Sequence, residues 1–248
     1  MITAIVNQKG GTGKTTTAIN LGKGLSKCGR KVLLIDLDAQ GNLSYSLSVN
    51  DFNQSMSDVL MGDVSLKDII VTREEMDVAP SEVSLSDVEL SISNFENRAS
   101  VLKEVLGDIS GYDNILIDCP PSLSLLTVNA LNAAENVLIP MQLEVLSLQG
   151  LDQISQTIDK IRKAYNRNLK IMGILPVMVD KRRKLSAEIY DHINENYDFR
   201  IFDSSIRTNV RASEAPSFGQ SVISYDPRSN SALDYMALAN EVLMLNDN

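Results

Sequence analysis

The stretch NQKGGTGKTT at residues 7–16 follows a short apolar run and leads into an apolar, helix-like pattern. It resembles a phosphate-binding loop but departs from the usual spacing, because Gln8 stands where the first glycine of that loop is expected. A second lysine, Lys9, lies next to a pair of glycines. The stretch therefore predicts a nucleotide site whose loop carries one lysine more than phosphate binding requires.

The other residues of this loop have the types that phosphate binding needs. Glycines allow backbone N–H groups to turn inward and approach phosphates closely, and the helix that follows adds partial positive charge at its N-terminus. Lys14 is placed to reach the β- and γ-phosphates, and the Thr15 hydroxyl is placed to ligate Mg²⁺. The alternative is a glycine turn without a ligand, against which the Lys-Thr pair argues. The predicted nucleotide-binding residues here are Gly10, Gly11, Thr12, Gly13, Lys14, Thr15 and Thr16.

Apolar, β-branched runs alternate with helical patterns along the chain. Strands are expected at 2–7, 31–38, 114–120, 136–140 and 170–179, and helices at 14–29, 123–133, 144–165, 183–196 and 230–244. This alternation predicts an α/β fold with a doubly wound, mostly parallel sheet and helices on both faces, as in P-loop NTPases. The sequence has no internal repeat, low-complexity tract or linker, which predicts a single domain over residues 1–248.

The acidic stretch 50–110 is less regular than the rest of the chain. It predicts short helices near 55–61 and 97–107, and a short strand near 77–79. These elements are too short for their patterns to define them sharply.

Three aspartates lie where a metal site would require them. Asp36 and Asp38 end the second expected strand, and Asp118 ends the run NILID. Ligands of open α/β sheets bind beyond the carboxyl ends of the strands, so all three acids should gather around one pocket. Asp36 and Asp38, two apart, should project to the same side, one steadying a metal-bound water and the other orienting the attacking water. The predicted Mg²⁺ site is Thr15 and Asp118 with one of Asp36 and Asp38; the alternative for Asp36 or Asp38 is a helix cap.

Charge is spread unevenly over the 248 residues, whose net charge of −9 argues against a generic nucleic-acid binder. Residues 41–100 hold eleven acids and three bases, whereas residues 160–184 hold nine bases and one acid. This asymmetry predicts a basic patch on an acidic protein, the alternative being a solvated helix face.

The two cysteines, Cys28 and Cys119, have no metal-ligand spacing and are both expected in the core. The first residues lack the features of a signal peptide, and no apolar run approaches a membrane-spanning length. We therefore expect a cytoplasmic protein in a reducing compartment.

Three stretches, KGGTGKTT, LLIDLDAQGNLS and ILIDCPPSLS, resemble the nucleotide motifs of the ParA/Soj family of deviant Walker A ATPases, in the ParA/MinD superfamily. A fourth, NVRASEAPSFG at 209–219, resembles a later family motif, and together they span the chain nearly end to end. One departure is Ala39, where the family usually has proline. The resemblance implies an ATPase that uses ATP and Mg²⁺, is weak alone and is stimulated by a ParB-like partner.

The resemblance also implies a role for the extra lysine. Lys9 matches the family's signature lysine, which reaches the nucleotide of the other subunit in an ATP-bound homodimer; the alternative is a solvated loop lysine. Lys9, Lys14 and Asp38 would then be the catalytic residues, with Asp38 handling the attacking water. Thr15 would bind Mg²⁺, and Asp36 and Asp118 would support the metal. By family position, Pro176, Ser217 and Phe218 would lie near the adenine, although Pro176 could simply end a strand.

The family's use of ATP implies a further partner. ParA proteins bind DNA non-specifically as ATP dimers, and NVRASEAPSFG matches the segment whose arginine helps bind DNA. The expected contacts are Arg211, Arg182, Arg183 and Arg207, which would touch phosphates and make binding strongly salt-dependent. No helix-turn-helix segment precedes the loop, so binding is expected to be nucleoid-wide rather than operator-specific. The cargo stays open between a chromosome, a plasmid and a protein cluster.

The alternative function is that of a MinD-like membrane-associated positioning ATPase. That branch carries a basic amphipathic C-terminal helix. The tail SALDYMALANEVLMLNDN holds no Lys or Arg, and its acids would be repelled by anionic lipid. We interpret the tail as a core-packing helix and expect no stable membrane association.

Overall fold

The computed structural model describes residues 1–180 and 184–246, and within them the strands form one sheet of eight. The strand order is β3-β4-β2-β5-β1-β6-β7-β8, and every neighbouring pair is parallel except β3 with β4. This arrangement confirms the predicted α/β fold with a mostly parallel sheet. The strands are β1 Ile2–Ile5, β2 Val32–Asp36, β3 Val71–Arg73, β4 Met76–Ala79, β5 Asn114–Asp118, β6 Asn136–Met141, β7 Lys170–Val179 and β8 Ile206–Arg207.

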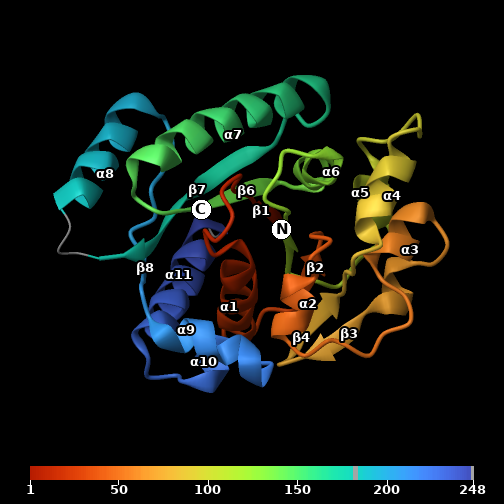
Figure 1. The fold of residues 1–248 in the computed structure, drawn as a ribbon, viewed down its shortest axis with the longest axis horizontal. Coiled ribbons are helices and arrows are strands. Elements are labelled where there is room, and N and C mark those ends of the chain that lie inside the picture. The colour runs from red at the N-terminus through yellow and green to blue at the C-terminus, as the bar shows by residue number, and fades with distance from the viewer. Residues whose placement is uncertain (181–183, 247–248) are drawn as a thin grey trace.

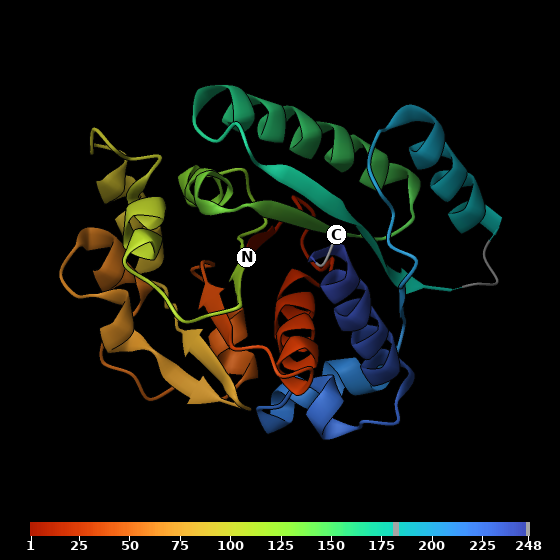
Figure 2. The ribbon, with the colours of Figure 1, turned by 180° about the vertical axis from the view of Figure 1, so that it is seen from behind.

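Helices cover both faces of the sheet, as Figures 1 and 2 show from opposite sides. The set α1, α2, α10 and α11 packs on one face, and α3 to α8 pack on the other. The helices are α1 Lys14–Lys27, α2 Asn42–Ser46, α3 Met56–Met61, α4 Leu85–Ile92, α5 Val101–Gly107, α6 Leu125–Ala133, α7 Val145–Ala164, α8 Lys184–Asn196, α9 Val210–Glu214, α10 Val222–Tyr225 and α11 Asn230–Asn246, with 3₁₀ turns at Leu66–Ile69 and Ala215–Phe218.

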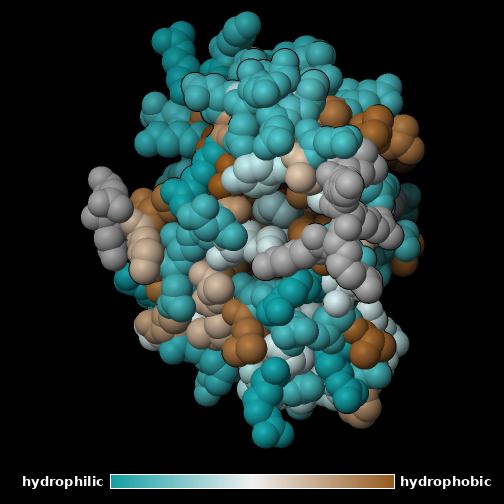
Figure 3. All heavy atoms as spheres, turned by 90° about the vertical axis from the view of Figure 1, so that its left-hand side faces the viewer, coloured by the Kyte–Doolittle hydropathy of each residue, from teal (hydrophilic) through white to brown (hydrophobic). Residues whose placement is uncertain are grey.

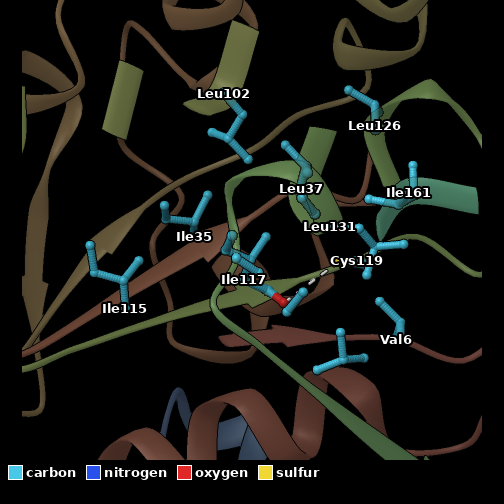
Figure 4. Close-up of a cluster of buried hydrophobic side chains, with 14 of the residues drawn as sticks. Val6, Ile35, Leu37, Leu102, Ile115, Ile117, Cys119, Leu126, Leu131 and Ile161 are labelled. Carbon is cyan, nitrogen blue, oxygen red and sulfur yellow. Dashed lines mark hydrogen bonds between the residues drawn. The ribbon is translucent and has the colours of Figure 1, made fainter. Parts of the chain in front are cut away.

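The central strands bury side chains on both faces. In β2, Val32 and Leu34 face the α1 side, whereas Leu33 and Ile35 face the other, as the period of two along a strand requires. On that second face Ile35 gathers with Leu102 of α5 and other side chains of the core (Figure 4). Each fully buried aliphatic side chain stabilises the fold by about 1.5–3 kcal/mol, so this two-sided core holds the carboxyl ends of the strands rigidly in place.

The predicted strands and long helices are confirmed, with boundaries that shift by a few residues. The strand near 77–79 and the helices near 55–61 and 97–107 are also present, as β4, α3 and α5. The elements α2, β3, α4, β8, α9 and α10 were not predicted, because each has eight residues or fewer and its stability depends on packing more than on local pattern.

The prediction that both cysteines lie in the core is wrong for Cys28, which is exposed. Helix α1 ends at Lys27, and the Cys28 amide caps it by donating to the carbonyls of Gly24 and Leu25. The apolar stripe of α1 therefore stops one turn earlier than its helical spacing suggested. Cys119 is buried, as predicted.

The C-terminal helix packs into the core, as predicted. Tyr235, Leu238 and Val242 of α11 are buried against the α1 side of the sheet, and the Tyr235 hydroxyl lies 3.3 Å from Thr17 Oγ1. Over the described part of the chain, none of the helices combines the length and the apolarity that a membrane crossing needs.

The buried lysine Lys23 of α1 forms hydrogen bonds that should stabilise the fold. Lys23 is 5% exposed, and its Nζ donates to the Glu74 carbonyl at 2.7 Å and to Glu75 Oε2 at 3.0 Å. Lys23→Met keeps the apolar stem but removes the charged hydrogen bonds, so we expect it to lower the free energy of unfolding by about 1–3 kcal/mol. Urea denaturation measures this, with Lys27→Met, on the exposed last turn of α1, as the matched control.

Candidate nucleotide site

The loop between β1 and α1 is tied to the neighbouring strand β6. The Asn7 side chain donates to the Pro140 carbonyl at 2.6 Å and accepts from the Lys9 amide at 3.0 Å. Thr12 Oγ1 donates back to the Lys9 carbonyl at 3.2 Å, which closes the loop on itself. The loop's own polar residues therefore fix its position relative to β6.

Two glycines of the loop adopt a backbone conformation that other residues avoid. Gly11 and Gly13 both have φ of 73°, and Gly13 directly precedes α1. The first amides of α1 have no acceptor inside the helix and carry its positive dipole end. They face a cavity of about 410 Å³, lined by Gly10, Gly11, Thr12, Gly13, Lys14, Thr15, Thr16, Asp38, Gln40, Asn42, Ser46, Pro121 and Met178. The structure thus brings all the loop residues predicted from Gly10 to Thr16 together around one cavity suited to an anion.

The lysine of this cavity is largely withdrawn from solvent. Lys14 is 7% exposed; burial lowers its pKa, and the nearby carboxylates of Asp118 and Asp38 act in the opposite direction. A cation in such surroundings gains most from a bound anion, because its charge is poorly hydrated.

Thr15 and Asp118 form the inner wall of the site. Thr15 Oγ1 donates to Asp118 Oδ2 at 2.6 Å. The other carboxylate oxygen, Oδ1, is buried and has no hydrogen-bond donor among the described residues. Burial and the neighbouring Asp36 carboxylate raise the pKa of Asp118 well above its ordinary value. A hydroxyl, an unsatisfied carboxylate oxygen and excess negative charge are the donor set that suits Mg²⁺.

Asp36 lies behind this wall instead of facing the cavity. Its carboxylate accepts hydrogen bonds from the Ser44 amide at 2.9 Å and from the Ser44 hydroxyl at 2.8 Å. Burial raises its pKa to about 6, and the hydrogen bonds from Ser44 act against this rise. Asp36 and Asp118 are register partners at the buried ends of β2 and β5, whereas Asp38 lies in the loop beyond and lines the cavity. The structure therefore places the three predicted carboxylates beside one another at one edge of the sheet, with Asp36 and Asp118 behind the cavity wall.

Lys9 extends away from the cavity to the loop after β6. Its Nζ lies 3.0 Å from Glu144 Oε2 and 3.1 Å from Gln142 Oε1, and the Lys9 side chain is 43% exposed. Gln142 in turn contacts Met178, its Nε2 lying 2.6 Å from the Sδ atom. The sequence analysis did not identify Gln142, Glu144 and Met178, because their contacts join residues far apart in the chain and no local motif predicts such contacts.

A second, larger groove adjoins the first through Met178. It has a volume of about 700 Å³ and lies beyond the carboxyl ends of β6, β7 and β8, on a face that is mostly hydrophilic (Figure 3). Met178 lines both cavities and has φ of 54°, a strained value for a residue other than glycine. The residues that line this groove are Gln142, Leu143, Glu144, Val177, Met178, Val179, Asp180, Ser186, Arg207, Thr208 and Asn230.

The residues predicted near the adenine do not line either cavity. Pro176 is buried inside β7, where it pairs with Met141 of β6. Ser217 and Phe218 are exposed, and the Phe218 ring stacks on Tyr225 with ring centroids 5.0 Å apart. Pro176 therefore ends up as a strand residue, the structural alternative that the sequence left open.

The arginines predicted to bind DNA are already paired where the structure describes them. Arg207 contacts both carboxylate oxygens of Asp234, the shortest distance being 2.6 Å. Arg211 contacts Glu214 at 2.7 Å and Asp226 at 3.5 Å. Arg182 and Arg183 lie outside the described residues.

Comparisons with known proteins agree on one family. Residues 1–171 match the family model of an AAA domain. The chain is 43% identical over 249 residues to the chromosome partitioning protein ParA of Caulobacter vibrioides (strain NA1000 / CB15N), covering 98% of this chain and 93% of that protein. It is 43% identical over 246 residues to the sporulation initiation inhibitor protein Soj of Bacillus subtilis (strain 168), covering 97% of each.

A solved structure shares both the fold and a moderate sequence identity. The structure of cobyrinic acid a,c-diamide synthase from Mycobacterium smegmatis with bound ADP and magnesium matches with a TM-score of 0.86 and 33% identity, over 98% of this chain and 93% of that one. One family accounts for three findings: the P-loop fold, the loop with two lysines, and the similarity to ParA and Soj over nearly the whole chain. The chain belongs to the ParA/Soj family of partition ATPases, within the ParA/MinD superfamily.

Proposed function

We propose that the ATP-bound chain forms a homodimer, binds DNA without sequence preference, and is reset when a ParB-like partner stimulates hydrolysis. The observation that carries this proposal is the position of Lys9. A lysine on the phosphate loop that points away from its own cavity, with its side chain partly exposed, is available to a second subunit. The names of the relatives favour a chromosome as cargo, with a plasmid or a protein cluster as the alternatives.

The proposal gives each site residue a role. Backbone amides from Gly10 to Thr16 and the Lys14 ammonium hold the phosphates of ATP, and Asp38 orients the attacking water at the cavity wall. Thr15 and Asp118 would hold Mg²⁺, which would neutralise negative charge on the phosphates, and Asp36, the register partner of Asp118, would add negative charge behind the metal site.

The adjoining groove is the best place for the nucleotide base. It opens directly from the phosphate cavity past Met178 and presents polar groups such as Thr208 beside apolar side chains such as Val177. We propose this groove in place of the region around Pro176, Ser217 and Phe218.

The charges of the phosphates and of Lys9 would make dimerisation depend on ATP. Two ATP-bound faces that meet would bring two sets of phosphates into one poorly hydrated interface, where a cation from the opposite subunit offsets the repulsion. Lys9 supplies that cation when it leaves Gln142 and Glu144. Without a γ-phosphate to receive it, Lys9 stays on its own subunit and the dimer lacks its main bridge.

This arrangement makes a prediction for Glu144. Glu144→Gln keeps the hydrogen bond to Lys9 but removes the ion pair, so Lys9 should leave its own subunit more easily. We expect the ATP-driven dimer to form at several-fold lower protein concentration, since an exposed ion pair contributes up to about 1 kcal/mol. Analytical ultracentrifugation with ATP measures this, with Glu82→Gln as a charge-matched control. Unchanged or weaker dimerisation would show that Glu144 does not restrain Lys9.

DNA binding is tested by the fluorescence anisotropy of a random-sequence labelled duplex. We expect binding with ATP and little with ADP or without nucleotide, and a steep loss of affinity as the salt concentration rises. Charge reversal by Arg211→Glu should weaken binding to every duplex alike, because phosphate contacts carry no sequence information. Equal binding in all nucleotide states, or none in any, would refute the ATP-gated DNA step.

The membrane-associated alternative gains no support from the C-terminal helix. The apolar side chains Tyr235, Leu238 and Val242 are buried in the core. The acids Asp234 and Glu241 of this helix are paired with Arg207 and Arg200, respectively. An amphipathic anchor would need the apolar face free for lipid.

A further inference from the structure

The stretch that carries the two described DNA-contact candidates has no net charge. Residues 206–234 hold three arginines and three acids, so their formal charges cancel. The arginines are Arg207, Arg211 and Arg228, and the acids are Glu214, Asp226 and Asp234. A surface meant for a polyanion would ordinarily carry an excess of cations. This balance calls for an explanation other than a simple basic patch.

The carboxylates around Arg211 are held in place by other donors as well. Arg211 Nη1 donates to Glu214 Oε2 at 2.7 Å, and the same oxygen accepts from the Tyr225 hydroxyl at 3.3 Å. Arg211 Nε lies 3.5 Å from Asp226 Oδ2, while Asp226 Oδ1 accepts from the Arg228 amide at 3.3 Å. When Arg211 turns to another anion, both carboxylates therefore stay beside it.

All three side chains are accessible to a ligand. Arg211 is 47% exposed, Glu214 38% and Asp226 35%. Exposed ion pairs of this kind are weak, so a DNA phosphate can displace the carboxylates from the guanidinium. Breaking both ion pairs uses part of the free energy that the phosphate contact supplies, which lowers the affinity for DNA.

We propose that Glu214 and Asp226 are a built-in competitor for DNA phosphate at Arg211, which keeps the protein's affinity for DNA low. This inference rests on the proposed function, because it assumes that Arg211 contacts DNA. Weak, quickly reversible binding is what a protein needs if it must leave DNA whenever its nucleotide state changes. The competitor also reduces the number of counterions that DNA releases on binding, since the Arg211 charge is already neutralised within the protein.

The test uses variants that remove the competing charge and preserve shape. Glu214→Gln and Asp226→Asn keep an oxygen acceptor for Tyr225 and for the Arg228 amide. The matched control is the double variant Asp63→Asn, Asp108→Asn, which also removes two negative charges, at exposed positions just beyond the ends of α3 and α5 and far from α9 in Figure 1. The full chain with ATP is titrated against a random-sequence labelled duplex over a salt series, and thermal unfolding verifies that each variant is folded.

We expect the double variant Glu214→Gln, Asp226→Asn to bind DNA about tenfold more tightly than the unchanged chain. Its plot of log affinity against log salt should be steeper by about one, because carboxylates of the same chain no longer offset the Arg211 charge. The control Asp63→Asn, Asp108→Asn should change the affinity less than about twofold. In an Arg211→Ala background the double variant should no longer increase the DNA affinity, because the guanidinium that the two carboxylates neutralise is absent.

Other outcomes separate the inference from the proposed function. The competitor is refuted, while DNA binding stands, if the double variant gains no DNA affinity, gains no more than the control Asp63→Asn, Asp108→Asn, or keeps its gain in the Arg211→Ala background. If neither the unchanged chain nor any folded variant binds DNA with ATP, the DNA step of the proposed function fails and the competitor falls with it.

Discussion

Lys9→Ala is expected to abolish ATP-dependent dimerisation while leaving the ATP affinity of the single chain almost unchanged. Lys9 does not line the cavity that faces the phosphates; its Nζ is bound to Gln142 and Glu144 instead. Its removal should therefore change the ATP affinity of the single chain little. The dimer, however, loses the cation that offsets the repulsion between two sets of phosphates at the interface.

The effect on partner-stimulated hydrolysis should be large. A cation delivered in trans to a transferring phosphoryl group accounts for roughly 10³-fold or more of the rate in comparable ATPases and GTPases. Isothermal titration measures ATP affinity and light scattering measures mass, each on the same preparation. A Lys9→Ala protein that still dimerises with ATP would refute the trans role, and one that loses ATP affinity would place Lys9 in its own subunit's site.

Lys14→Ala is expected to weaken ATP binding itself, by roughly 100-fold, since charged hydrogen bonds to a phosphate are worth up to about 3 kcal/mol. Lys14 is buried at the cavity wall, where no water can replace its ammonium without loss. Dimerisation and DNA binding should disappear with it, because both are proposed to depend on bound ATP.

The matched control for Lys14 lies on the same helix. Lys23 is also a buried lysine of α1, but its partners are Glu74 and Glu75, not a ligand. Lys23→Met should lower the free energy of unfolding and leave the ATP affinity unchanged. Lys14→Ala should lower the ATP affinity and leave the free energy of unfolding unchanged. Normal ATP affinity in Lys14→Ala would mean that the cavity between Gly10 and Thr16 does not hold the phosphates.

The centre of the fold could be predicted from sequence because its signals are local. The loop between β1 and α1 needs glycine at the positive φ of Gly11 and Gly13, and the buried strands β2 and β5 are continuous apolar runs that end in aspartate. Such features are properties of a few consecutive residues. The periphery, with β3 and α4, could not be predicted because it is stabilised mainly by what it packs against.

The ion pairs around the site could not be predicted from sequence because they join residues that are far apart in the chain. Lys9 meets Glu144 across 135 positions of the chain, and Arg207 meets Asp234 across 27. No window of sequence contains both partners of the first pair. The motif resemblance implied which lysine and which arginines matter, but only the folded chain shows that Lys9, Arg207 and Arg211 already have carboxylate partners within the same chain.

The measurement that tests the central claim most directly is the mass of the Asp38→Ala chain by multi-angle light scattering. Asp38 lines the cavity, and without it hydrolysis should stop with ATP still bound. Our account predicts twice the mass of the chain with ATP and Mg²⁺, and the mass of one chain with ADP and Mg²⁺. The mass of one chain with ATP, in a protein that titration shows to be saturated with ATP, would contradict it.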